Sequence, residues 1–71
     1  MPGITVEYKS EWIVKAVNKN SPAERSGVQV GDIITAINDD QVAADTKFHG
    51  SGTVKTLTVR RDGQSLTLKL K

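Results

Sequence analysis

The chain has 71 residues, enough for one small domain with a modest core. Ten Lys and Arg side chains and eight Asp and Glu side chains are scattered along it, so the net charge of +2 forms no basic block of the kind that binds nucleic acid or an anionic membrane. The absence of cysteine excludes a disulfide scaffold and a thiolate metal site, and no apolar stretch approaches the roughly 18 residues of a membrane span.

The first two predicted strands form a hairpin. Within residues 4–8, Ile4, Val6 and Tyr8 alternate with polar residues, which is the period of a half-buried strand. Residues 12–17 (WIVKAV) are apolar and mostly β-branched apart from one lysine. Because the two runs are separated only by a short polar segment, we expect them to pair.

A short helix is predicted to follow this hairpin. Ser21 can accept a hydrogen bond from an exposed amide of the first turn, Pro22 suits the first helical position, and Glu24 completes a capping box. Gly27 offers a C-terminal cap within two turns. The helix must therefore be brief.

The middle of the chain predicts the central strand and a second helix. Gly31 and Asp32 form a tight turn, after which residues 33–37 (IITAI) enter the centre of the sheet as a nearly continuous apolar strand. Residues 43–49 (AADTKFH) have moderate helical character, with an acidic residue near the start and basic residues near the end, as the helix dipole prefers.

The end of the chain predicts a second hairpin, because Asp62 and Gly63 lie between two alternating runs. The expected fold class is α+β, a half-open barrel or sandwich of about five strands with two short helices, in one domain over residues 1–71. The core is expected from the apolar residues of these elements: Val14, Val17, Ala23, Val28, Ile33, Ile34, Ile37, Val42, Leu57, Val59, Leu66 and Leu68.

Some conspicuous side chains allow two interpretations. Trp12 is either part of the core, which we favour, or an anchor for a partner. Arg60 and Arg61 are expected to form a solvated face of the last hairpin rather than an anion site. His49 is expected to be a solvated histidine at the end of the second helix.

No catalytic or metal-binding motif is evident. Asp39, Asp40 and Asp45 do not have the spacing of a known calcium loop. The serines and the single histidine lack a Gly-x-Ser-x-Gly motif or a metal-binding histidine pair. We therefore expect no metal, no cofactor and no enzymatic activity from this chain.

The segments "SPAERSGVQVGDIITAIN" and "VKTLTVRRDGQSLTLKL" resemble a PDZ domain of the bacterial type, as found in envelope proteases and peptidases. The resemblance covers nearly the whole chain. It implies a PDZ-like fold in which Ala23, Gly27, Gly31 and Asp32 shape the short helix and turn that support the sheet. These residues would be scaffold, and the ligand would lie elsewhere.

The resemblance also implies a binding mode. Domains of this family bind an extended peptide by adding it as a strand to an open sheet edge, with the terminal carboxylate held by a loop of exposed amides. Gly3 would allow that loop to turn, and Phe48 with Ala44 or Thr46 would form the wall facing the strand. The implied peptide-binding residues are Gly3, Ile4, Thr5, Val6, Ala44 and Phe48.

The chain departs from the family pattern in two places. Only Met1 and Pro2 precede the loop where the family has a strand, so that strand is either missing or supplied from the other end of the chain. The segment between Val42 and Gly52 is also shorter than the family's groove helix and following loop, which predicts a short or closed groove.

The leading functional hypothesis is a peptide-binding module, regulatory or substrate-presenting, cut from a larger bacterial protease or peptidase. Its partners would be a peptide or protein C-terminus and the parent catalytic domain, and the resemblance implies a periplasmic or other extracytoplasmic location. The alternative is a structural module that packs on its parent without binding free peptide. A self-contained enzyme is the third class considered. We expect the isolated domain to be a monomer with no nucleic-acid partner and no membrane contact.

Overall fold

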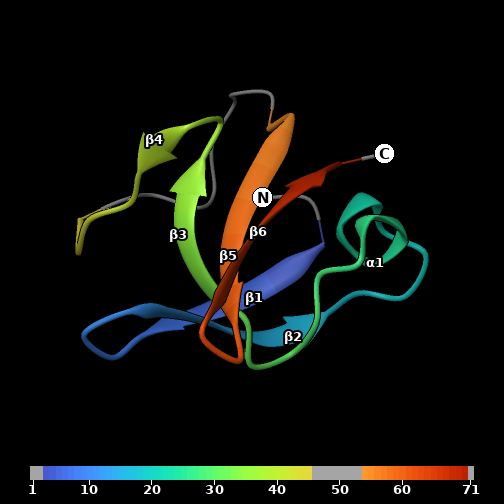
Figure 1. The fold of residues 1–71 in the computed structure, drawn as a ribbon. Helices are drawn as coiled ribbons and strands as arrows, with labels where there is room; N and C mark the ends of the chain where they lie inside the picture. The colour runs from blue at the N-terminus through green and yellow to red at the C-terminus, as the bar shows by residue number, and fades with distance from the viewer. Residues whose placement is uncertain (1–2, 46–53, 71) are drawn as a thin grey trace.

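The structure is a computed structural model that describes residues 3–45 and 54–70. Its antiparallel sheet has the order β1-β2-β3-β5-β6, and a short strand β4 pairs with β3. In Figure 1 the strand β4 lies at the left, beside β3, and the helix α1 lies at the right. The elements are β1 (Ile4–Tyr8), β2 (Trp12–Val17), α1 (Pro22–Ser26), β3 (Ile33–Ile37), β4 (Asp40–Gln41), β5 (Thr56–Arg61) and β6 (Gln64–Lys69).

The predicted fold class is confirmed. The sheet formed by the described residues ends at β1 on one side and at β6 on the other, so it is half-open rather than a closed barrel. The strand β3 occupies the centre, as its apolar sequence predicted. The last strand, from the C-terminal end of the chain, completes the sheet beside β5. In the described residues no helix has the length and apolarity needed to cross a membrane.

Both predicted hairpins form. The first pairs β1 with β2 and contains a bulge, because Thr5 faces Ala16 while Val6 faces Val14, which leaves Lys15 as an extra residue on β2. The second pairs β5 with β6 through a two-residue turn.

That second turn has the left-handed backbone conformation expected of an Asp-Gly pair. The φ angles are 51° at Asp62 and 79° at Gly63. A turn of this kind matches the twist of the flanking strands, and it fixes the register of the hairpin from two local residues.

The helix α1 begins and ends at the predicted caps. The Ser21 hydroxyl accepts a hydrogen bond from the amide of Glu24 at 3.2 Å, and Gly27 adopts a left-handed φ of 97°. The capping box differs in one contact, since the Glu24 carboxylate accepts from the amide of Asn20 rather than from that of Ser21. Ala23 is the fully buried residue of this helix.

Replacing the helix cap should destabilise the domain by a modest amount. We expect Ser21→Ala to lower the free energy of unfolding by about 1 kcal/mol, because the amide of Glu24 loses its acceptor. Urea unfolding monitored by circular dichroism measures this. Ser65→Ala, at an exposed serine of β6, is the control and should change little. Equal losses in the two variants would contradict the role of Ser21 as a cap.

The core lies on one face of the sheet, under α1 and the turn that follows it. Among the described residues six hydrophobic side chains are buried there, and all six were predicted from the sequence: Val14, Ala23, Val28, Ile34, Leu57 and Val59. Five other predicted residues pack against this cluster and are half-buried: Val17, Ile37, Val42, Leu66 and Leu68.

One core prediction was wrong, and the predicted second helix was not confirmed in the part of it that the structure describes. Ile33 was predicted in the core, but it pairs with Ile13 next to the buried Ile34 and therefore points to the opposite face, where it is half-buried. The second helix, expected over residues 43–49, is not observed at 43–45, and residues 46–49 lie outside the described residues.

Candidate functional site

The strand β1 forms one edge of the sheet, and the hydrogen bonds of β2 show which of its backbone groups face outward. Val14 uses both of its backbone groups on the side of β3: its amide donates to Asp32 at 2.9 Å, and its carbonyl accepts from Gly31 at 2.8 Å. Val6 lies opposite Val14. Since Val14 has no backbone group left for β1, the amide and carbonyl of Val6 point toward the open edge.

The backbone groups at the beginning of β1 also alternate between β2 and the outer edge of the sheet. The carbonyl of Gly3 accepts a hydrogen bond from the amide of Asn18 at 2.6 Å, so Gly3 faces β2. Backbone groups alternate in direction along a strand, and the amide and carbonyl of Ile4 therefore point outward, like those of Val6. The bulge does not disturb this alternation, because the extra residue belongs to β2.

The side chains of β1 alternate as the sequence predicted. Ile4 and Val6 are half-buried and pack against the core, whereas Thr5 and Glu7 are exposed on the other face. The backbone of Thr5 pairs with Ala16. Of the predicted binding residues on β1, Ile4 and Val6 thus combine an outward backbone with an inward apolar side chain.

Gly3 forms a turn immediately before β1, as expected. Its φ of 84° lies in the left-handed region that favours glycine. A Cβ atom at this position would also overlap the Cβ and hydroxyl of Ser21, the residue that caps α1. The space beside Gly3 is therefore closed to a side chain.

A cavity of about 260 Å³ lies near the far end of β1. Ala44, one of the predicted binding residues, is exposed and lines it together with Tyr8 and Trp12. The indole N–H of Trp12 donates to the carbonyl of Ala43 at 2.7 Å, which ties the segment after β4 to β2. Phe48, predicted to form the facing wall, lies outside the described residues.

Trp12 was interpreted from the sequence either as a core residue or as an anchor for a partner, and its surroundings have features of both. It is half-buried and packs against the core, and its ring centroid lies 5.0 Å from that of Tyr8. Tyr8, the partner of Trp12 in this aromatic pair, is 42% exposed. Trp12 is thus a core residue that also borders a cavity.

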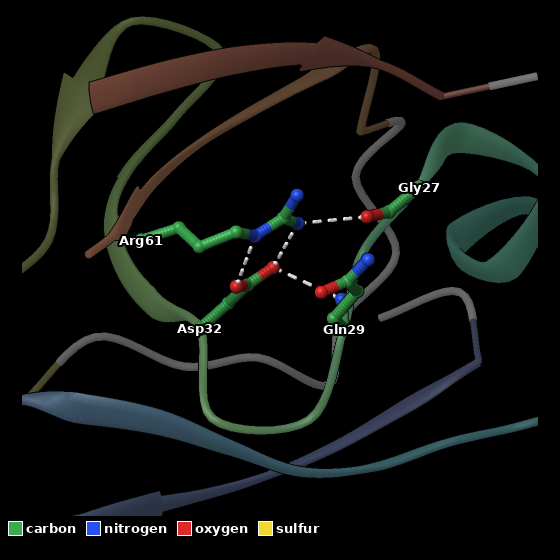
Figure 2. Close-up of polar contacts among 4 residues, drawn as sticks. All are labelled: Gly27, Gln29, Asp32 and Arg61. Atoms are coloured by element: carbon green, nitrogen blue, oxygen red, sulfur yellow. Dashed lines mark hydrogen bonds and ion pairs between the residues drawn. The ribbon is translucent and has the colours of Figure 1, made fainter. Parts of the chain in front are cut away.

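The turn before β3 is held by a buried ion pair. Asp32 is 2% exposed, and its two carboxylate oxygens accept from the Nε and the Nη2 of Arg61 at 2.8 and 2.7 Å (Figure 2). The same carboxylate accepts from the amide of Gln29 at 2.9 Å, and Arg61 also donates to the carbonyl of Gly27 at 2.8 Å. These contacts join the turn after α1 to the end of β5.

The contacts of Asp32 determine its ionisation. Burial raises the pKa of a carboxyl group, but the hydrogen bonds from Arg61 and from the amide of Gln29, together with the positive charge of Arg61, outweigh burial and lower the pKa of Asp32 below 3.8. The same pairing raises the pKa of Arg61. Asp32 is therefore a charged structural residue at neutral pH, in agreement with its expected role as scaffold.

The prediction of a solvated arginine pair on the last hairpin was wrong. The side chain of Arg61 is only 27% exposed and binds Asp32, and Arg60 is half-buried and forms an ion pair with Glu11. Neither contact had a local signal in the sequence, because Arg61 and Asp32 are 29 residues apart and Arg60 and Glu11 are 49 residues apart. Among the described residues, no three His, Cys, Asp or Glu side chains cluster in a way that would hold a metal ion.

Comparison with known proteins identifies the family. The family model described as "PDZ domain" matches residues 13–61. The structure is similar to the crystal structure of the HtrA3 PDZ domain bound to a phage-derived ligand, FGRWV, with a TM-score of 0.79, 26% sequence identity, and coverage of 99% of this chain and 81% of that chain.

Two curated relatives are bacterial proteins named as probable serine proteases. A "Probable CtpA-like serine protease" of Staphylococcus epidermidis is 36% identical over 97% of this chain, and a "Probable periplasmic serine protease do/HhoA-like" of Haemophilus influenzae is 36% identical over 82% of it. The matched segments are 16% and 14% of those two proteins, so the chain spans about a sixth or less of the relatives that it resembles.

The family model, the sequence relatives and the similar solved structure all indicate the same family. A PDZ domain is a non-catalytic module, which accounts for the absence of a catalytic motif from the sequence. The chain belongs to the PDZ domain family, of the kind carried by bacterial serine proteases.

Proposed function

We propose that this chain is the peptide-binding module of a larger bacterial protease and that it binds extended C-termini by strand addition to β1. The observation that carries the proposal is the open edge of β1, where Ile4 and Val6 direct their backbone amides and carbonyls away from β2. A peptide strand aligned antiparallel to β1 would use these groups for its ladder.

The ends of β1 set the direction of the peptide. The left-handed turn at Gly3 comes directly before the strand and suits a loop whose amides receive a carboxylate. The last side chain of the peptide would lie over Ile4, with Phe48 as the facing wall. The HtrA3 PDZ domain is bound to a ligand that ends in valine, which supports an apolar last residue here.

The relatives suggest the kind of protein that carries this module and where that protein is located. Both are named as probable serine proteases, and one is named periplasmic. We place this chain, by analogy, beside a catalytic domain in an extracytoplasmic protease, where it would present substrate or regulate activity.

Capping the peptide terminus tests the binding mode. A five-residue peptide that ends in valine with a free carboxylate should bind with micromolar affinity, because a short ligand buries little area and must be ordered. The same peptide with a C-terminal amide should bind about tenfold more weakly, because it loses charge-assisted hydrogen bonds to the loop amides. Titration followed by amide chemical shifts measures both affinities and locates the site.

The pattern of shifts distinguishes strand addition from other modes. Strand addition requires the largest shifts at residues 3–8, with the β6 edge as an internal control. Equal affinity of the acid and the amide, or shifts confined to β6, would contradict it. No shifts at millimolar peptide would favour the alternative of a structural module that packs on its parent.

A further inference from the structure

We propose that the cavity bordered by Tyr8, Trp12 and Ala44 binds an aromatic side chain four residues before the C-terminus of the ligand. This inference rests on the proposed function, since it requires a peptide strand along β1. It adds a second specificity site at the opposite end of that strand from the carboxylate loop.

The position of the cavity on the sheet is the first argument. Tyr8 pairs with Trp12, and Trp12 pairs with Ile34, so the three side chains form one row across β1, β2 and β3. Directly paired residues point to the same face, and Ile34 is buried in the core. The row therefore lies on the face that carries Ile4 and Val6, and all three of its residues line the cavity.

The register of strand addition supplies the second argument. If the last residue of an antiparallel peptide lies opposite Ile4, the residue opposite Tyr8 is the fourth before it, because β1 runs through five residues from Ile4 to Tyr8. Side chains alternate along a strand, so this upstream side chain points to the same face as the last one. It would thus point toward the cavity.

The lining of the cavity indicates the class of side chain. Its volume of about 260 Å³ is below the roughly 300–1,000 Å³ of sites that hold whole small molecules, and it suits one side chain. Two aromatic rings, of Tyr8 and Trp12, line it with an interplanar angle of 57°. The nearby carboxylate of Glu11 is already paired with Arg60, so a cationic side chain would gain little there. An aromatic ring would add a third member to the aromatic pair.

Peptides that differ at one position test the inference. The reference peptide has phenylalanine as the fourth residue before a C-terminal valine and small residues between them. A second peptide replaces this phenylalanine with glycine, and a third moves the phenylalanine one position toward the terminus, where its side chain would point to the other face. We expect the reference peptide to bind about three- to tenfold more tightly than the other two, which is the usual contribution of an aromatic contact.

Two protein variants complete the test. Tyr8→Ala removes one wall of the cavity, so it should abolish the preference for phenylalanine, and the reference peptide and the glycine peptide should then bind this variant with equal affinity. Glu7→Ala, at the exposed neighbour on the opposite face of β1, is the matched control and should keep the preference. The chain has a single tryptophan, so its indole N–H resonance reports directly on the cavity and should shift only with the reference peptide.

The outcomes separate this inference from the function on which it rests. Binding of all three peptides with equal affinity would overturn the second site and leave strand addition intact. A preference that survives in Tyr8→Ala, or an indole resonance that does not move, would also overturn it. Failure of every peptide to bind would overturn the proposed function, and the inference with it.

Discussion

Ile34→Ala is expected to unfold most of the domain at room temperature. Ile34 is 1% exposed at the centre of β3, and its truncation leaves a cavity that costs about 2–5 kcal/mol. A single core in a chain of this length rarely supplies more than about 3–5 kcal/mol of stability. Urea unfolding measured by tryptophan fluorescence would show a midpoint near zero urea.

The neighbouring residue provides a matched control for this loss. Ile33→Ala removes the same atoms from the same strand, but Ile33 is half-buried on the opposite face and outside the core cluster. It should therefore cost clearly less than Ile34→Ala. Equal losses at the two positions would mean that the core is not confined to the face described above.

Asp32→Asn is expected to lower stability at neutral pH and to weaken its acid dependence. At neutral pH the loss of the charged acceptor of Arg61 should cost about 1.5–3 kcal/mol. The pKa of Asp32 is lowered in the folded state, so the stabilisation from its charge is fully present above the ordinary value of 3.8. It is lost as the pH falls below that value and through the lowered pKa of the folded state.

The experiment is a series of urea midpoints from neutral pH to about pH 2, because carboxyl groups ionise within this range. The fall in midpoint below pH 4 should be smaller in Asp32→Asn than in the unmodified chain. Asp39→Asn, at an exposed residue outside the ion pair, is the control. An identical fall in the unmodified chain and in Asp32→Asn would show that this carboxylate does not contribute to acid unfolding.

Local signals in the sequence predicted the parts of the fold that depend on few residues. The Asp62-Gly63 turn, the glycine cap at Gly27 and the serine cap at Ser21 are each determined within a few positions, and all three were confirmed. Apolar patterning also identified each buried core residue within 3–45 and 54–70. The exception among core predictions, Ile33, lies in a continuous apolar strand, where no alternation indicates which side chains point inward.

Contacts between distant segments could not be predicted in this way. Arg61 looked like a surface residue because it adjoins an exposed turn, and only the folded chain brings it to Asp32. The cavity beside Trp12 likewise depends on three strands and on the segment at Ala44. The family resemblance pointed to β1 as the proposed binding edge, and the register of β1 on β2 explains physically which of its backbone groups point away from β2.

The close approach of Gly3 to Ser21 limits how this domain can be altered. Any side chain at position 3 would have to displace Ser21, whose hydroxyl also donates to the carbonyl of Asn18 at 2.7 Å. An engineer who wishes to change ligand preference by substitution at position 3 would therefore change the start of α1 at the same time. Under the proposed binding mode, specificity is more freely altered from the other end of β1, where the exposed ring of Tyr8 lies away from the helix cap.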